Sequence, residues 1–426
     1  MMNISDRIHR DLPGGLSEIL DCVRRSPVAR EGRVYLVGGA VRDALLGCSI
    51  SDLDLVVEGD AVALAQRVAS DMGAKVVAHP RFGTAKIGCE GLSVDFAGGR
   101  GESYSRPGAL PSVWPGTLND DLRRRDFSVN AMAVCLGENG YGDLIDPCGG
   151  QHDVVSRLIR VLHGQSFRDD ATRIVRAIRY EQRLGFELES ETGRLLERDL
   201  PMLDSISGDR LRHELESILG EGCPELAISR LGSLGALERI CPPLKGNGWL
   251  VHVFREARKW NTVGKLSTLY LCLLCYRMSE SEVEAVTSRL RVPGKVGRAV
   301  RQTVLLRGSL PALCEPNVRP SDIDLAVRGY EVLAIEANAI AAESAVAREG
   351  LIRFLRKLRY VRPSLNGEAL KRLGVPQGVV MGMVLEELRR AKLDGEVGSR
   401  ADEERLVASL RLADHESGSQ WRSVPR

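Results

Sequence analysis

The spacing of apolar residues changes near residue 150, and this change constrains the fold more than any other feature of the sequence. Before it, short apolar or alternating runs punctuated by Gly and Pro predict strands, and residues 61–72 have helical spacing. After it, nearly all spacing is helical. We therefore predict an α+β chain, a small α/β domain followed by helices, with strand candidates at residues 33–37, 53–57, 74–77, 84–87 and 92–96.

The length of 426 residues exceeds what one ordinary hydrophobic core accommodates, so several domains are expected. No apolar run approaches the roughly 20 residues that cross a bilayer, and the first residues lack the pattern of an export signal. Ten cysteines without a regular framework suit a reducing compartment. Cys272 and Cys275 lie in an apolar run typical of a buried helix rather than of a zinc site. We expect a cytoplasmic protein without membrane contact, and predict no protein partner.

The formal net charge of +2 provides no strong whole-molecule attraction for a polyanion, so a nucleic acid needs a local basic patch. One candidate patch spans residues 353–362. There, Arg353, Arg356, Lys357 and Arg359 are interleaved with apolar and aromatic residues. An amphipathic helix with solvated arginines accounts for this segment equally well.

A phosphate-binding turn is indicated at residues 36–47, where a strand-like run leads through Gly38 and Gly39 into a helix carrying Arg42. Glycines let the backbone approach phosphate oxygens, the start of a helix offers free N–H groups, and an arginine can donate two parallel hydrogen bonds. A Gly-Gly turn before a helix is weak evidence by itself. The carboxylates that follow it strengthen the interpretation.

Asp52 and Asp54 lie in a strand-like run, and positions two apart on a strand point to the same face. Two close carboxylates repel unless a cation lies between them. Mg²⁺ prefers such oxygen ligands, and a two-metal site can activate an attacking hydroxyl and stabilise leaving pyrophosphate. We predict that Asp52 and Asp54 bind Mg²⁺ and, with Asp95 as a candidate third carboxylate, are catalytic. The alternative is a pair of solvated aspartates at a sheet edge.

The pattern of Asp52 and Asp54 recurs almost letter for letter at residues 321–327. The second copy lacks an upstream Gly-Gly turn and arginine. We predict that it starts a helix, with Ser321 as N-cap and Asp322 and Asp324 in the first turn. Spacing alone is therefore not diagnostic, and the Gly-Gly context distinguishes the first copy.

A second group of polar residues lies at positions 121–133. Arg125 is predicted to bind phosphate, and Asp126 and Asn130, four apart on one helical face, are predicted to bind ribose hydroxyls. A solvated basic helix start is the alternative.

A third group, at residues 166–180, contains Asp169, Asp170 and Arg173 at helical spacing, followed by Arg176 and Arg179. A carboxylate accepts from an exocyclic amine while an arginine donates to a ring nitrogen. Cytosine and adenine present that pair of groups; uracil and guanine present a carbonyl beside an N–H. We predict that this segment selects CTP and ATP. A surface ion pair on a helix is the alternative.

Together these motifs resemble those of the class II tRNA nucleotidyltransferases, the bacterial CCA-adding enzymes and their poly(A) polymerase relatives in the polymerase β superfamily. The likeness is strong from residue 33 to about 219 and weaker beyond. It implies a polymerase-β-like head followed by an all-helical neck, body and tail, the tail contacting tRNA. The implied ranges are a helical lead-in at 1–30, head at 31–150, neck at 151–220, body at 221–340 and tail at 341–426.

The resemblance implies transfer of CMP, CMP and AMP from CTP and ATP to the tRNA 3′ end, with Mg²⁺ as cofactor. Asp169 replaces the Glu of many members, and its Asp-Asp form is similar to members that add only part of CCA. Residues 100–111 have the length of the family's mobile loop, which argues against a CC-only enzyme. The alternatives are an A-adding enzyme, a CC-adding enzyme, a poly(A) polymerase, or a catalytically inactive RNA-binding protein.

Overall fold

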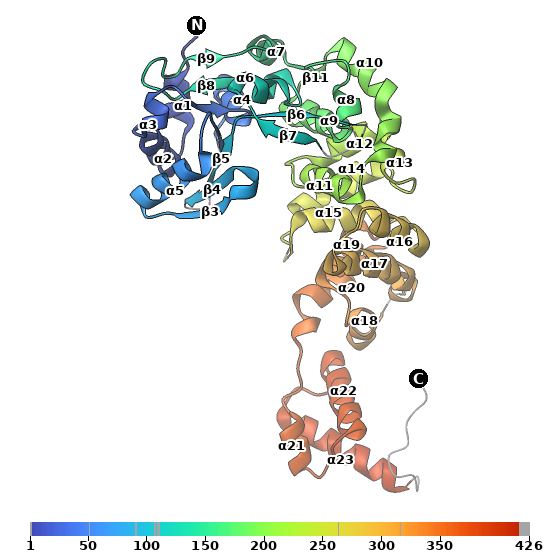
Figure 1. The fold of residues 1–426 in the computed structure, drawn as a ribbon. Helices are drawn as coiled ribbons and strands as arrows, with labels where there is room; N and C mark the ends of the chain where they lie inside the picture. The colour runs from blue at the N-terminus through green and yellow to red at the C-terminus, as the bar shows by residue number, and fades with distance from the viewer. Residues whose placement is uncertain are drawn as a thin grey trace. The chain divides into compact units, whose positions relative to one another are not determined.

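The computed structural model describes residues 2–416, with the exception of Ser51, Glu90, Gly91, Arg106, Pro107, Ala109, Leu110, Val263 and Pro316. The chain divides into two compact units, Met1–Pro242 and Pro243–Arg426 (Figure 1). Each unit is described by itself.

The first unit opens with three helices, within the range predicted as a helical lead-in. They are α1 (Ser5–Asp11), α2 (Gly14–Arg24) and α3 (Pro27–Arg30). The apolar side of α2 is fully buried, including Leu16, Ile19 and Leu20. It packs against α5 (Ala61–Met72), the helix predicted at those residues. Asp60 caps α5 by accepting from the Ala63 N–H.

A seven-stranded mixed sheet in the described part of this unit has the order β3-β4-β5-β2-β1-β8-β9. All five predicted strands form in it. The added strands β8 and β9 were not predicted. The bounds are β1 (Val34–Val37), β2 (Asp52–Val57), β3 (Lys75–His79), β4 (Thr84–Cys89), β5 (Leu92–Gly98), β8 (Ala133–Cys135) and β9 (Leu144–Ile145).

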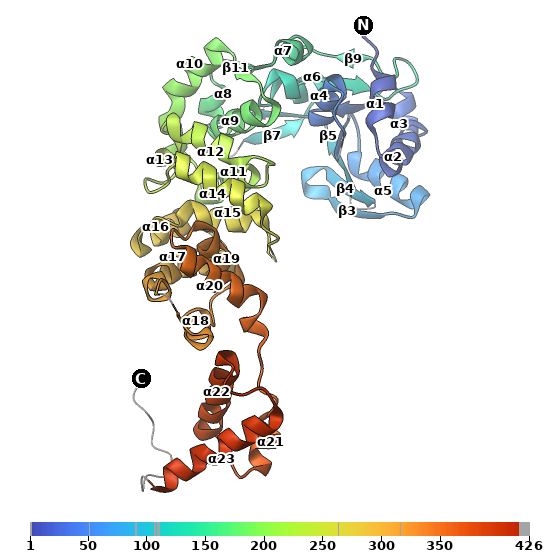
Figure 2. The same ribbon diagram turned by 180° about the vertical axis from the view of Figure 1, so that it is seen from behind.

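Helix α5 packs on β3, β4 and β5 (Figure 2). On β4 and β5, side chains that alternate toward it are buried. Ile87, Val94 and Phe96 are examples, each completely buried. Helix α4 (Gly39–Leu46) follows β1 and contacts β1 and β2. The helix–sheet packing fixes β2 and β5, and therefore the carboxylates they carry.

Outside the sheet the first unit is mainly helical. The range predicted as an all-helical neck, residues 151–220, also contains two short strands, so that prediction is wrong in this detail. The short strands β10 (Leu158–Ile159) and β11 (Glu187–Leu188) pair in parallel. A separate hairpin of β6 (Arg100–Ser103) and β7 (Ser112–Pro115) lies before them in sequence. The helices are α6 (Leu118–Arg123), η2 (Ser128–Asn130), α7 (Gly150–Ser156), α8 (Ser166–Asp169), α9 (Thr172–Leu184), α10 (Ser190–Asp199), η3 (Leu200–Ser205), α11 (Gly208–Leu219), α12 (Pro224–Ser233) and α13 (Ala236–Ile240).

The described residues of the second unit contain helices and no strand. The helices are α14 (Gly248–Lys259), α15 (Leu266–Cys275), α16 (Glu280–Arg289), α17 (Gly294–Ser309), α18 (Pro320–Val327), α19 (Val332–Ala341), α20 (Ala345–Arg356), α21 (Gly367–Arg372), α22 (Val379–Asp394) and α23 (Arg400–Glu416). Cys272 and Cys275 are buried in α15, as predicted. Among the described helices, none combines the length and apolarity that a membrane span requires.

The second Asp-x-Asp copy forms α18, so the predicted helix start is confirmed, but its predicted N-cap is wrong. Arg319 occupies the N-cap position and Pro320 the first turn. The Ser321 hydroxyl instead donates to Asp394 at 2.7 Å. Asp324 lies beyond the first turn of α18 and is buried. There its carboxylate forms a two-point ion pair with Arg389.

Candidate active site

The turn between β1 and α4 brings the backbone against two polar side chains. Gly38 has a φ of 72°, which favours glycine, and a Cβ there would lie 2.7 Å from Arg125 Nη1 and 3.7 Å from Asp54 Oδ2. Arg42 is buried in the helix that follows. Its guanidinium donates to Asp43 at 2.9 Å and to Asn130 Oδ1 at 2.6 Å, and its role as a phosphate donor stays a prediction.

The three predicted carboxylates lie on one face of the sheet. Strands β2 and β5 pair in parallel with Asp54 opposite Asp95 and Asp52 opposite Ser93, so all four side chains share a face. The Ser93 hydroxyl donates to Asp52 at 3.0 Å, and Lys86 Nζ on β4 donates to Asp95 at 2.9 Å. This hydrogen bond to Asp95 raises the pKa of Lys86.

Asp54 lies at the centre of the acidic group. Partial removal from water raises the pKa of its carboxyl, and the neighbouring carboxylates of Asp95 and Asp52 add to the rise, against the opposing charge of Arg125. A divalent cation relieves such repulsion, and an open face carrying acidic oxygens fits its preference for hard ligands. Among the described residues, no group of three or more acidic, histidine or cysteine side chains is arranged to hold one ion. Asp95 is paired with Lys86.

Asp121, for which no role was predicted, supports two consecutive arginines. Its fully buried carboxylate accepts from Arg125 at 2.9 and 3.1 Å and from Arg124 at 3.0 Å. The buried acid therefore holds Arg125 beside Gly38 and Asp54. Capping of α6 by Thr117, which reciprocates with Asp120, fixes the helix that positions Asp121.

Asp126 and Asn130 are adjacent, but the predicted helical face is wrong. Helix α6 ends at Arg123, and Phe127 is extended before the short turn η2. The extended residue replaces a helical turn, and the Asn130 amide reaches Asp126 directly, at 3.0 Å. Burial opposes ionisation of Asp126, yet the Arg176 guanidinium, whose Nε donates to it at 2.9 Å, holds its pKa below the usual range.

The predicted pairing of Arg173 with Asp169 or Asp170 through helical spacing is also wrong. Helix α8 ends at Asp169, Asp170 is extended, and α9 begins at Thr172, so the residues do not share one helix. The Asp170 Oδ1 accepts from the Thr172 N–H at 3.0 Å and from Arg210 at 2.6 Å. Arg210, on α11, was missed because helix α11 is distant in sequence.

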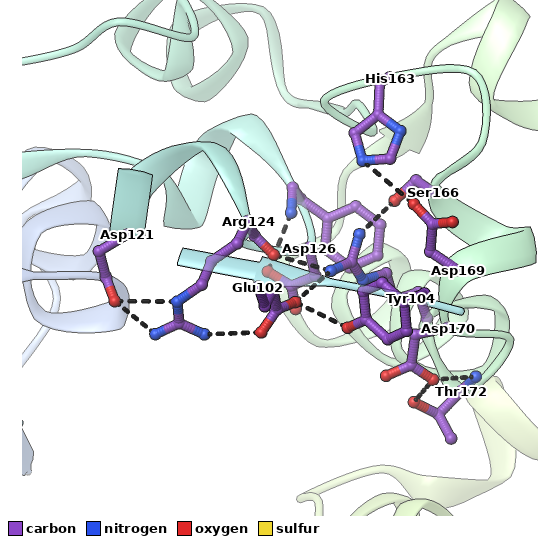
Figure 3. Close-up of polar contacts among 12 residues, drawn as sticks. Glu102, Tyr104, Asp121, Arg124, Asp126, His163, Ser166, Asp169, Asp170 and Thr172 are labelled. Atoms are coloured by element: carbon purple, nitrogen blue, oxygen red, sulfur yellow. Dashed lines mark hydrogen bonds and ion pairs between the residues drawn. The ribbon is translucent and has the colours of Figure 1, made fainter. Parts of the chain in front are cut away.

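Glu102 is a second missed residue, and Figure 3 shows it between Arg124 and Tyr104. Its carboxylate accepts from the Tyr104 hydroxyl at 2.7 Å, and it lies 3.5 Å from Arg124 and 3.6 Å from Arg173. Arg173 also donates to the Arg124 carbonyl at 2.7 Å. Burial, with the hydrogen bond to Glu102, raises the pKa of Tyr104.

Glu102 and Tyr104 belong to the segment predicted as a mobile loop, of which four residues lie outside the described structure. These are Arg106, Pro107, Ala109 and Leu110. Asp169 turns the other way from Asp170 and lies 3.8 Å from His163, a distance at which the two groups interact only if His163 is protonated. Burial lowers the pKa of His163, with Asp169 opposing.

One cavity of about 530 Å³ collects most of the predicted residues of the first unit. Asp52, Arg42, Asp169 and Arg179 lie outside its lining; Arg179 is 4.0 Å from Glu214 and 3.7 Å from Glu221. The predicted residues that line the cavity are Gly38, Gly39, Asp54, Asp95, Arg125, Asp126, Asn130, Asp170, Arg173 and Arg176. The residues predicted to bind the cation, the phosphates and the base therefore border one space.

Two family models match parts of the chain. The model described as "Poly A polymerase head domain" matches residues 34–160, and "Probable RNA and SrmB- binding site of polymerase A" matches residues 185–246. The first covers the whole sheet and the second covers helices α10 to α13. The fold and the acid-lined cavity therefore define a class, the nucleotidyltransferases with a polymerase-β-like head.

Curated relatives carry three activities in their names. The A-adding tRNA nucleotidyltransferase of Geobacter sulfurreducens is 37% identical over 89% of this chain and 45% of its own length. The CC-adding enzyme of Deinococcus radiodurans is 42% identical over 47% of this chain and 54% of its own. The CCA-adding enzyme of Geobacillus thermodenitrificans is 30% identical over 88% and 92%. The chain spans between 44 and 62% of the length of the A-adding relatives it matches.

Solved structures agree with these matches. The Thermotoga maritima CCA-adding enzyme complexed with tRNA is 29% identical, with a TM-score of 0.75 over 96% of this chain and 99% of that one. A CCA-adding enzyme with ATP gives a TM-score of 0.78 at 29% identity over 96% and 99%. The chain belongs to the family of class II tRNA nucleotidyltransferases and poly(A) polymerases.

Proposed function

We propose that the chain transfers CMP, CMP and AMP from CTP and ATP to the 3′ end of tRNA, completing the terminal CCA. The observation that carries the proposal is the single cavity bordered by Asp54, Asp95, Arg125, Asp170 and Arg173. In the reaction, the 3′ oxygen bonds to the α-phosphorus, the bond to pyrophosphate breaks, and the hydroxyl proton leaves.

The groups around the glycine turn are assigned to the triphosphate and the ribose. Gly38 and Gly39 let the backbone approach the phosphates, and Arg125, held by Asp121, donates to them. Asp126 and Asn130 bind ribose hydroxyls. Arg42 keeps Asn130 in place through their 2.6 Å hydrogen bond, in addition to the phosphate contact that the sequence predicts.

Asp52, Asp54 and Asp95 are the residues that would hold the divalent cation, for which we propose Mg²⁺. The bound cation supplies positive charge for the attacking oxygen and the leaving pyrophosphate. Ser93 orients Asp52 through the 3.0 Å hydrogen bond. Asp54 also interacts with Arg125, so it connects the proposed cation site with the arginine that is assigned to the phosphates.

Asp170 and Arg173 are assigned to the base. The Oδ1 atom of Asp170 accepts the hydrogen bonds from Thr172 and Arg210, and Oδ2 is assigned to accept from the exocyclic amine of cytosine or adenine. Arg173 has five N–H groups and donates to a ring nitrogen from those not used by Ser166 and the Arg124 carbonyl. Uracil and guanine present the opposite pattern. Arg176 lines the cavity, and Asp169 and Arg179 lie outside its lining. We assign all three a supporting role in nucleotide binding.

An A-adding enzyme is the second candidate, and the names of the relatives favour it. A-adding relatives are 33 to 41% identical, and two of them match 84 to 89% of this chain. The Asp169-Asp170 pair agrees with partial CCA addition. The same site chemistry serves both candidates, because cytosine and adenine present the same edge to Asp170 and Arg173.

The basic residues at positions 353–359 are assigned to tRNA binding. We retain the division into lead-in, head, neck, body and tail as a proposal. Arg353 and Arg356 on α20 and the following Lys357 are exposed, whereas the intervening Phe354 is buried in the core. Arg359 lies 4.8 Å from the ring centre of the exposed Tyr360, an arrangement suited to stacking on a base.

The test uses three transcripts of one tRNA, lacking CCA, lacking only the final A, or of unrelated sequence. Purified full chain is given Mg²⁺ with CTP, ATP or both, and UTP and GTP serve as controls. Sequenced products ending in CCA from the first transcript support the proposal. Extension of the second transcript alone assigns the A-adding activity, and long A tails on the third assign a poly(A) polymerase. If no transcript is extended by well-folded protein that still binds tRNA, the chain is an inactive RNA-binding protein.

A further inference from the structure

One half of the sheet has a face that no helix covers in the described part of the first unit. Helix α5 packs on one side of β3, β4 and β5, and the side chains that alternate away from it are exposed on β3 and β4 and half-buried on β5. On the edge strand these are Lys75, Val77 and His79, and on β4 they include Lys86. Val77 is 58% exposed. This open face continues directly into the carboxylates.

Strand register fixes the order of groups across this face. Lys86 is opposite Asp95, Asp95 is opposite Asp54, and Asp54 is opposite Val37, the residue before Gly38. The row therefore runs from the glycine turn, through two carboxylates, to a lysine. Lys86 is half exposed, so its ammonium can leave Asp95 for another anion without crossing packed atoms.

The geometry of nucleotidyl transfer suggests that the leaving pyrophosphate and the RNA acceptor strand bind at opposite ends of the row from Val37 to Lys86. In-line displacement places the attacking and leaving oxygens on opposite sides of the reacting phosphorus. The groups assigned to the leaving pyrophosphate, Gly38, Gly39 and Arg125, lie at the Val37 end. The acceptor strand must therefore approach from the other end, where Lys86 is the cation nearest to the carboxylates in the strand register.

We propose that Lys86 binds the phosphodiester of the 3′-terminal acceptor nucleotide, on an open sheet face formed by β3, β4 and β5. Lys86 neutralises Asp95 in the absence of ligands, and moves to the RNA phosphate when the carboxylates bind their cation. Lys75 and His79 lie farther along the face, where preceding nucleotides pass, and Val77 packs against a sugar or base. The inference rests on the proposed transfer to RNA and identifies its acceptor surface.

The test compares Lys86→Met, Lys86→Arg and Arg67→Met in the full chain. Arg67 lies on α5, on the covered side of the same strands, and its exposed side chain is outside the proposed site, so this control removes an equal charge. Binding of a tRNA transcript lacking CCA is measured with Ca²⁺ in place of Mg²⁺ over a series of salt concentrations. For single-stranded RNA, removing one lysine–phosphate interaction lowers the slope of log affinity against log salt by about 0.7.

We expect Lys86→Met to weaken RNA binding about three- to tenfold and to lower the salt slope by about 0.7. With Mg²⁺, it raises KM for the RNA and leaves KM for CTP or ATP within about twofold. Lys86→Arg keeps most of the affinity, and Arg67→Met matches the unchanged chain. Binding of Mn²⁺, followed by its electron spin resonance, is measured in parallel to detect an effect on the carboxylates.

The inference is overturned if Lys86→Met changes Mn²⁺ affinity but leaves RNA affinity and salt slope equal to those of Arg67→Met. Lys86 is then only a counter-charge for Asp95. It is also overturned if nucleotide KM rises as much as RNA KM. If the unchanged chain extends no RNA, the proposed function fails by itself, and the Ca²⁺ binding data still decide whether Lys86 contacts RNA.

Discussion

The two Asp-x-Asp copies have nearly the same letters and opposite structural roles. In β2, Asp52 and Asp54 point to one exposed face beside Asp95, because strand side chains repeat every two residues. In α18, Asp322 and Asp324 are two residues apart on a helix and point to nearly opposite sides. One is exposed beside Arg319, and the other is buried.

The difference shows that backbone conformation, not residue spacing, decides whether two carboxylates can share a cation. The first copy follows a glycine turn and enters a sheet; the second follows Arg319 and Pro320, which suit the start of a helix. Arg389 then neutralises Asp324 completely, with donations at 3.0 and 2.6 Å. The same Asp-x-Asp pattern therefore forms an exposed acidic face in β2 and a buried ion pair in α18.

The first prediction removes one carboxylate from each copy. Asp54→Asn is expected to lower nucleotidyl transfer by at least about 100-fold, since losing even a supporting residue of a metal site typically costs about 10- to 100-fold. Asp322→Asn, at the exposed aspartate of α18 that corresponds to Asp52, is expected to leave transfer unchanged. Single-turnover incorporation into a tRNA transcript measures both, and thermal unfolding verifies that both variants fold.

Equal reduction of transfer in the two variants would contradict the distinction between the copies. Unchanged transfer in Asp54→Asn would remove Asp54 from the proposed cation site. Binding of tRNA is expected to stay nearly intact in both variants, because neither carboxylate is assigned to a phosphate.

The second prediction concerns stability. Asp324→Ala leaves the Arg389 guanidinium buried without its carboxylate, which is expected to cost about 3 to 5 kcal/mol in the free energy of unfolding. Urea unfolding of the full chain measures it, with the second unit losing stability first. Arg389 also donates to the carbonyls of Leu358 and Val361, so its displacement disturbs the segment that follows α20.

The control replaces both partners, as Asp324→Leu with Arg389→Met. Since apolar pairs of similar volume often replace buried ion pairs without a decrease in stability, the double variant is expected to recover most of the stability. A single Asp324→Ala variant as stable as the unchanged chain would show that the pair is not closed to water.

Sequence reasoning predicted the elements whose apolar spacing is unambiguous. The helix at 61–72 forms as α5, and all five strand candidates form. Strand β8 (Ala133–Cys135) was missed because all three of its residues are buried, and a fully apolar run does not separate strand from helix by periodicity. Its pairing with β1 is a tertiary contact that the local sequence does not contain.

The site was predicted at the level of residues better than at the level of contacts. Asp126 and Asn130 were predicted on one helix, but Phe127 is extended between them. Asp170 was predicted within a helix, but it is extended and separates α8 from α9. Glu102 and Arg210 reach the cavity from β6 and α11. Periodicity describes one element at a time, whereas these contacts join elements far apart in the chain.

The last prediction tests the glycine turn that the first copy has and the second lacks. In Gly38→Ala, the new Cβ lies 2.7 Å from Arg125 Nη1, so the guanidinium must move. Losing one charged hydrogen bond to phosphate, worth about 1.5 to 3 kcal/mol, is expected to raise KM for CTP and ATP. Gly47→Ala is the control for a positive φ without a close contact, because its φ is 69° and no atom lies within 4 Å of its Cβ. Its ψ of 29° differs from the −132° of Gly38, so thermal unfolding measures the strain of each variant separately. Both variants lose stability through the strained φ, but only Gly38→Ala moves Arg125. If nucleotide KM rises equally in both, then backbone strain explains the effect, and the close approach of the turn to Arg125 does not distinguish the first Asp-x-Asp copy from the second.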